Sequence, residues 1–222
     1  MSDAADIRDP FDLLASARRV ANLAQSEGIS VSGGTLRPRY DHLGAILADS
    51  VLQAGLNYRT VVRPRVTRIL FSYPHAATLE GLLSLVEAEM TSEFLGWNHA
   101  VKVQRFERLA RFIAHENILD TGELRRRLQD DLFGIQLQAL DGVGPKTVDY
   151  MACLVGIETI AVDRHIRNFA QRVGVVRREY DYLKRVFCIA ADLLAVSRRE
   201  FDAWIWRREA AKATPQLYMD FG

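Results

Sequence analysis

Two residues in the second half of the chain could perform nucleophilic chemistry. Lys146 follows the turn Gly142-Val143-Gly144-Pro145, which predicts a place for it in the first turn of a helix. The positive end of the helix dipole disfavours an ammonium there and should lower the pKa of the lysine, and a neutral amine can attack carbon. Asp163 follows one helix and a short return later, where a carboxylate could stabilise developing positive charge or help to shuttle protons.

Both residues also have an ordinary structural explanation. A lysine in a first helical turn can be solvated, form a salt bridge or touch a phosphate. Asp163 directly precedes Ile166, Phe169, Ala170 and Val173, which recur at helical spacing, so it is also a natural N-cap. Each position on its own favours the structural explanation, and the functional hypothesis depends on the two occurring together.

The turn before Lys146 is typical of a helix–hairpin–helix. Gly142 and Gly144 can adopt positive φ angles, and Pro145 suits the first position of a helix. Backbone N–H groups exposed at such a turn, beside a helix N-terminus, suit a phosphate. A plain turn between two helices, capped by glycine, is the alternative. Apolar residues at helical spacing lead into the turn and out of it: Leu124, Leu128, Leu132 and Ile135, then Val148, Met151, Ala152 and Val155.

Helical periodicity dominates the rest of the chain, and no long strand alternation occurs. We therefore expect an all-α protein of roughly ten helices. We expect these helices to form two lobes with a cleft between them. One lobe would span residues 41–158 and end in the hairpin, and the other would combine residues 1–40 and 159–222. Asp163 would then face Lys146 across the seam between the lobes.

Composition excludes several classes of protein. The chain has 222 residues, of which 49% are hydrophobic and 26% charged, and a net charge of +1 that by itself indicates no nucleic-acid partner. Its apolar stretches are too short to span a bilayer, and the acidic N-terminus is unlike a signal peptide, so we expect a cytoplasmic protein. The two cysteines form no C-x-x-C pair, which excludes a zinc ribbon and an all-cysteine iron–sulfur cluster.

The stretches Leu140–Thr147 and Ala161–Ile166 together resemble the helix–hairpin–helix DNA glycosylase superfamily, and the lysine form resembles its endonuclease III branch. That branch has an L-x-G-V-G-x-K-T hairpin followed by V-D-x-H. The resemblance is closest over residues 139–174. It implies that the cleft between the two helical lobes binds DNA. It further implies a base-excision repair enzyme, located in the cytoplasm at the nucleoid, that acts as a monomer on double-stranded DNA containing a damaged base.

The resemblance also implies roles for individual residues. Lys146 would attack C1′ and form a Schiff base, Asp163 would assist, and the strand would then be cleaved by β-elimination. Three hairpin residues would contact phosphate through their backbone, with or without a bound monovalent cation: Gly142, Val143 and Gly144. Gln53 would fill the gap left by the flipped base, although a polar residue at a helix end explains it nearly as well.

Two further features qualify the resemblance. The chain lacks the four C-terminal cysteines that hold an iron–sulfur cluster in many endonuclease III relatives, so neither a cluster nor any other cofactor is expected. The loop containing Leu95 and Trp97 occupies the place of the family's wedge but matches it poorly. Arg164 and Arg167 share the helix that Asp163 precedes, and we expect them to contact DNA.

The sequence is therefore compatible with three functions. The leading one is a bifunctional glycosylase and abasic-site lyase for an oxidised base, with oxidised pyrimidines ahead of 8-oxoguanine. The second is a monofunctional glycosylase for alkylated or mismatched bases, which would leave the strand uncut. The third is a non-catalytic helix–hairpin–helix module that only binds DNA, which would need neither Lys146 nor Asp163.

Overall fold

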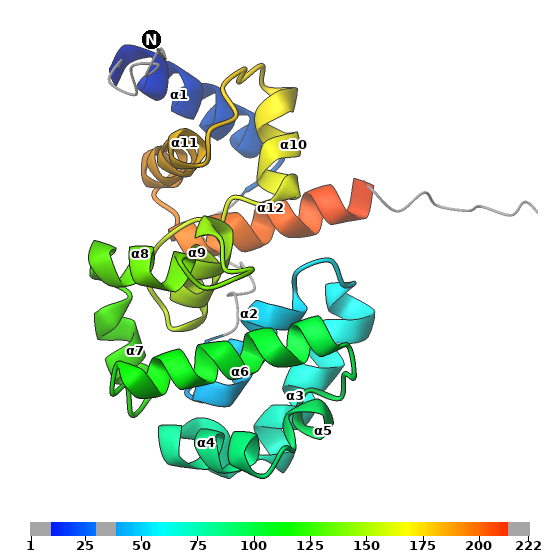
Figure 1. The fold of residues 1–222 in the computed structure, drawn as a ribbon. Helices are drawn as coiled ribbons and strands as arrows, with labels where there is room; N and C mark the ends of the chain where they lie inside the picture. Colours follow the sequence, from blue (N-terminus) through cyan, green and yellow to red (C-terminus); the bar gives the residue numbers. More distant parts are fainter. Residues whose placement is uncertain (1–9, 30–38, 213–222) are drawn as a thin grey trace, which may run out of the picture. The chain divides into compact units, whose positions relative to one another are not determined.

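The computed structural model describes residues 10–29 and 39–212. Within those ranges the protein is all-α, as the periodicity predicts, and contains twelve α-helices (Figure 1). Their bounds are α1 Pro10–Ser26, α2 Leu43–Leu52, α3 Arg63–Ser72, α4 Leu79–Glu87, α5 Thr91–Leu95, α6 Ala100–His115, α7 Thr121–Arg127, α8 Asp131–Gln138, α9 Pro145–Leu154, α10 Arg164–Arg172, α11 Tyr180–Leu193 and α12 Arg198–Lys212. A short π-helix, η1 (Tyr58–Val62), and a 3₁₀ turn, η2 (Pro74–Ala77), flank α3.

The chain divides into two compact units. One comprises Met1–Arg37 together with Glu158–Gly222, and the other comprises Pro38–Ile157. The first unit contains α1, α10, α11 and α12, and the second contains α2 to α9. The sequence analysis placed the corresponding boundaries at residues 41 and 158.

The second unit is built around α2. All ten residues of this helix are buried, because it packs against α3, α4, α6 and α9 on different sides. His42 caps its N-terminus by accepting a hydrogen bond from the backbone N–H of Ala45. The surrounding core includes large side chains from the other helices: Phe94, Phe106, Phe133 and Met151.

The first unit has a separate core. Helix α1 packs along α11, and α10 packs against α12. The apolar faces of these helices meet around three aromatic rings in T-shaped and tilted contact, Phe169, Phe187 and Phe201. Close packing of such rings accounts for the stability of a unit with only four helices.

The prediction of one helix through Leu124, Leu128, Leu132 and Ile135 is wrong. Asp130 interrupts it by accepting a hydrogen bond from the backbone N–H of Leu132, so that α7 ends and α8 begins. The break turns a different face of α8 inward. Phe133 and Leu137 are buried, whereas the side chains of Leu132 and Ile135 are 69% and 62% exposed.

Two other local patterns in the sequence differ from the structure. Asn98 has the residue type of an N-cap for α6, but His99 directly precedes that helix, so the cap is displaced by one residue. Ser197 and Glu200 have the spacing of a capping box, which is half formed: Oγ of Ser197 accepts from the backbone N–H of Glu200 and donates to Glu158. The expected loop over residues 29–38 lies almost entirely outside the described residues.

Candidate active site

Of the two glycines expected to allow a positive φ angle in the hairpin between α8 and α9, Gly142 adopts one and Gly144 does not. Gly142 has a φ angle of +76°, which L side chains rarely adopt, and Gly144 is extended at the N-cap of α9. The N–H of Val143 donates to the carbonyl of Leu140, which closes the turn, and its side chain is buried. Val143 can therefore contact a ligand only through its backbone.

The two glycines of the turn have different surroundings. A Cβ on Gly142 would lie about 2 Å from the guanidinium of Arg105, although Gly142 itself is exposed. A Cβ on Gly144, which is partly exposed, would have no described atom within 4 Å. A phosphate would be expected to approach the N-terminus of α9, next to Gly144.

Lys146 lies in the first turn of α9 and is partly buried. Its Nζ donates a hydrogen bond of 2.5 Å to Oε1 of Gln53, which is the C-cap residue of α2. The Nε2 of Gln53 donates in turn to the carbonyl of Ser50 at 3.4 Å. The structure thus brings together two residues that the sequence analysis selected for separate reasons, and it places the lysine amine at the end of a neighbouring helix.

A buried carboxylate lies one helical turn away from the contact between Lys146 and Gln53. Asp49 on α2 is fully buried, and its carboxylate accepts hydrogen bonds from three tyrosine hydroxyls: Tyr40 at 3.0 Å, Tyr58 at 3.2 Å and Tyr150 at 3.0 Å. Tyr150 is on α9, four residues after Lys146, as Asp49 is four residues before Gln53. The two helices are therefore held by two parallel contacts, one turn apart.

The tyrosines around Asp49 hold their protons tightly. Burial, followed by the negative charge of Asp49, raises the pKa of Tyr58 to about 12, against hydrogen bonds with Tyr40 and Tyr150 that lower it. Burial, followed by the charge of Asp49, also raises the pKa of Tyr40. A buried carboxylate needs such donors, because an unpaired charge in the interior is costly.

Helix α6 presents three cations to these elements. Lys102 donates from Nζ to the carbonyls of Val51 and Ala54, each at 2.8 Å, at the end of α2. Arg105 lies against Gly142, and Arg108 forms a 3.2 Å salt bridge with Asp141 just before it. Spaced three residues apart, the three side chains share one face of α6 and reach both sides of the candidate site.

Known proteins do not identify the chain. Neither a protein-family model nor a curated protein matches it. The likeness to helix–hairpin–helix glycosylases therefore depends on the residues of the two motifs, and the functional roles that it implies stay predictions.

Asp163 is the N-cap of α10, as its position predicts. Its Oδ1 accepts hydrogen bonds from the backbone N–H groups of His165 at 2.7 Å and Ile166 at 3.1 Å. The segment before it is anchored by Asp202, which accepts from the N–H of Ala161. Asp163 belongs to the first unit and Lys146 to the second, and their expected pairing across a seam stays a prediction.

The two arginines expected to contact DNA differ in their availability. Arg164 is exposed at the start of α10, and its Nε lies 3.4 Å from Nε2 of the buried His165. Arg167 is partly buried and donates from Nη1 to the carbonyl of Arg178. Arg164 is therefore the better placed of the two to reach a ligand.

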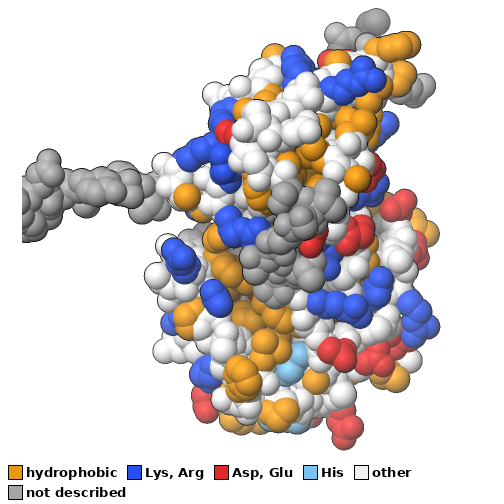
Figure 2. All heavy atoms as spheres, turned by 180° about the vertical axis from the view of Figure 1, so that it is seen from behind, with side chains coloured by type: hydrophobic (Ala, Val, Ile, Leu, Met, Phe, Trp, Pro, Cys, Tyr) orange, Lys and Arg blue, Asp and Glu red, His pale blue; other side chains and the backbone are white. Residues whose placement is uncertain are grey.

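Two other arginines near the motifs are engaged within the protein. Arg127 pairs with Glu116 and lies over Phe133, and Arg172 pairs with Glu27 and Glu209. On the face shown in Figure 2, Lys and Arg side chains are interspersed with Asp and Glu and with apolar side chains. Arg127 and Arg172 would therefore have to give up these ion pairs to contact a ligand.

The structure does not support Leu95 as a wedge. Leu95 is completely buried at the end of α5, where it belongs to the core of the second unit. Trp97 is partly buried, and the guanidinium of Arg65 lies 5.0 Å from the centroid of its ring. Arg65 also donates to the carbonyl of Gly96, so this loop is fixed by packing and capping.

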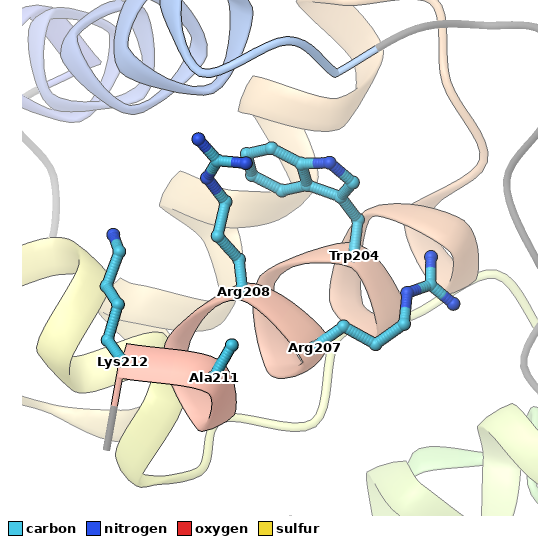
Figure 3. Close-up of a pocket in the computed structure, with 5 residues that line it drawn as sticks. All are labelled: Trp204, Arg207, Arg208, Ala211 and Lys212. Carbon is cyan, nitrogen blue, oxygen red and sulfur yellow. The ribbon is translucent and has the colours of Figure 1, made fainter. Parts of the chain in front are cut away.

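A hollow of about 450 Å³ lies on α12 (Figure 3). In the figure the guanidinium of Arg208 lies beside the indole of Trp204, 5.3 Å from its centroid, with Lys212 one turn further on. Both cations pair with Glu27. Burial alone would raise the pKa of Glu27, but hydrogen bonds from Arg172 and Arg208 lower it to about 2. The hollow therefore borders an ion cluster in which Arg172, Arg208 and Lys212 pair with Glu27 and Glu209.

No cluster of three or more His, Cys, Asp or Glu side chains that could hold a metal occurs among residues 10–29 and 39–212. Over the same ranges, no helix is both long enough and apolar enough to cross a membrane. Cys153 is buried in the core, as its place in an apolar helical pattern predicts.

Sequence reasoning missed four residues near Lys146. Asp49 had a usable signal, since it is the one acidic residue in an otherwise apolar ten-residue helix. Lys102 and Arg105 had a weaker one, the recurrence of cations every three residues along α6. Tyr150 had none, because an aromatic residue on a helix facing a core is ordinary.

Proposed function

We propose that the protein is a base-excision DNA glycosylase with an associated abasic-site lyase activity, and that Lys146 is its nucleophile. The observation that carries the proposal is the placement of Lys146. Its amine emerges at the N-terminus of the second hairpin helix, beside an open glycine turn, and contacts a glutamine from another helix.

The proposed reaction begins with attack of the neutral amine of Lys146 on C1′ of the damaged nucleotide. The bond between C1′ and the base breaks, and the base leaves with the electron pair and takes up a proton. Loss of a proton from nitrogen and opening of the sugar ring give a Schiff base. Removal of a C2′ proton then expels the 3′ phosphate by β-elimination, and water releases the enzyme.

The other residues have supporting roles in the proposal. The hairpin backbone at Gly142, Val143 and Gly144 would hold a phosphate without reading sequence. Asp163 would stabilise the positive charge that develops on the sugar. Gln53, which accepts a hydrogen bond from Lys146, would fill the gap left by the extruded base.

The substrate class is proposed from the resemblance alone. An oxidised base is favoured, and oxidised pyrimidines are placed ahead of 8-oxoguanine. Borohydride trapping on a panel of duplexes, each with one lesion, tests the proposal and identifies the substrate. Base release without trapping or strand cleavage would favour the monofunctional alternative. Unchanged DNA throughout, with retained binding, would favour a module that only holds DNA.

A further inference from the structure

Two of the four lysines in the chain converge on the end of one helix. Lys102 reaches the last turn of α2 from α6 and donates to the carbonyls of Val51 and Ala54. Lys146 reaches the same end from α9 and donates to Gln53, which lies between those two carbonyls in the chain. The chain is otherwise rich in arginine, so this pairing of lysines is distinctive.

The end of a helix provides a physical reason for the convergence. The final carbonyls of a helix have no partner within it, and they carry the negative end of the helix dipole. Lys102 satisfies two of them, so the backbone on either side of Gln53 is tied to α6. The Gln53 side chain is therefore presented from a fixed backbone, with its carbonyl oxygen at the Lys146 amine.

Lys102 is not an ordinary solvated lysine. It is partly buried, and burial lowers its pKa, with the positive charge of Arg105 lowering it further. The amine of Lys146, from α9, is a second cation that contacts this end of α2. Asp49, one turn earlier on α2, accepts hydrogen bonds from three tyrosine hydroxyls. Two cations at one helix end repel each other, and such repulsion favours the neutral form of a lysine.

We propose that Lys102 is a positioning residue for Lys146: by binding the last carbonyls of α2 it fixes Gln53 against the Lys146 amine, and it keeps a second cation at the same helix end. The inference rests on the proposed function, because it assigns the contact to preparation of the nucleophile. Without that role, Lys102 would only cap a helix, and the state of the Lys146 amine would not depend on it.

The test follows the Lys146 amine directly, without DNA. The full chain is labelled with ¹³C at the lysine Cε carbons, which gives four signals, and Lys146→Arg assigns the relevant one. The signal is titrated in wild type, Lys102→Met and Lys102→Arg. Arg111→Met is the matched control, since it removes a cation that is 64% exposed from the same helix, about 13 Å further along its axis.

We expect Lys102→Met to raise the pKa of Lys146 by about half a unit, because a repelling cation is lost. The neutral fraction at pH 7 then falls about threefold, and so does the rate of trapping on an abasic duplex. Lys102→Arg retains the cation, so it should restore most of the wild-type pKa of Lys146 and most of the trapping rate. Arg111→Met should change neither the pKa nor the rate. An unaltered Lys146 titration in folded Lys102→Met overturns the inference.

A second measurement keeps the inference testable if Lys102→Met does not fold. In wild type, the Lys146 signal should respond as Lys102 titrates, because interacting groups titrate as a pair. A single step at the ordinary lysine pKa of about 10.4, with no such response, overturns the inference. The proposed function fails separately, if wild type traps no duplex, and the lysine titrations are unaffected by that outcome.

Discussion

The amine of Lys146 and the side-chain carbonyl of Gln53 form a hydrogen bond although ninety-three residues separate them in the chain. Each residue stands at the end of a helix, Lys146 at the start of α9 and Gln53 after α2. The amine thus bridges the positive end of one helix and the negative end of another. This arrangement makes the protonation state of Lys146 sensitive to what occupies position 53.

Replacement of Gln53 by glutamate tests that sensitivity. A carboxylate in contact with the amine favours the ammonium form, and each unit by which the pKa of Lys146 rises lowers the neutral fraction tenfold. We expect Gln53→Glu to slow borohydride trapping on an abasic duplex by about tenfold or more at pH 7, with partial recovery at higher pH. Gln104→Glu, an exposed substitution on α6, adds the same charge and should have little effect.

Substitutions at the two hairpin glycines should have different effects, one on the stability of the fold and the other on DNA binding. Gly142→Ala places a methyl group at a positive φ and against Arg105, so we expect a loss of about 1 kcal/mol or more in the free energy of unfolding. Gly144→Ala meets open space and should fold nearly as well as wild type. If a phosphate approaches Gly144, that variant should nevertheless bind duplex DNA at least several-fold more weakly. Unchanged binding by Gly144→Ala, measured at one salt concentration, argues against a phosphate at this turn.

The tyrosine cluster around Asp49 predicts a loss of stability in alkali. Tyr58 titrates at about 12 in the folded protein and near 10 when unfolded. The folded state binds this proton more tightly, so the stabilisation is complete below pH 10 and is lost as the pH rises from 10 to 12. Urea unfolding at pH 9 and pH 11 should show a smaller loss for Tyr58→Phe than for wild type. Equal losses would mean that Tyr58 does not titrate in this way.

The ion cluster around Glu27 predicts a loss of stability in acid for the first unit. The pKa of Glu27 is about 2 in the folded protein and 4.5 without its partners. Its contribution is therefore complete above pH 4.5 and is lost as the pH falls toward 2. Unfolding followed by the fluorescence of Trp204 and Trp206 at pH 5 and pH 3 should show less acid sensitivity in Glu27→Gln. Glu80→Gln, on the exposed face of α4, should behave as wild type.

The sequence predicted those elements whose signals are local. Pro145 begins α9 and Asp163 caps α10, because caps and helical proline act within a few residues. Helical spacing failed between Leu124 and Ile135, where an unrecognised cap at Asp130 divides the helix and reverses which apolar residues are buried.

The candidate site was predictable only in part, for a physical reason. The hairpin turn and its lysine form a local motif that the residues reveal. The contacts of Lys146 with Gln53, and of Lys102 with the end of α2, join segments that are distant in the chain. Helical spacing shows which residues share a face, but it does not show which helix ends meet once α2, α6 and α9 have packed.

Borohydride trapping on an abasic duplex tests the central claim most directly, with wild type, Lys146→Ala and Asp163→Asn compared at equal concentration. The account predicts a covalent complex with wild type, none with Lys146→Ala, and slower formation with Asp163→Asn. A complex that persists in Lys146→Ala would assign the nucleophile to another amine. Failure of wild type to trap this duplex and every lesion duplex would contradict the lyase mechanism.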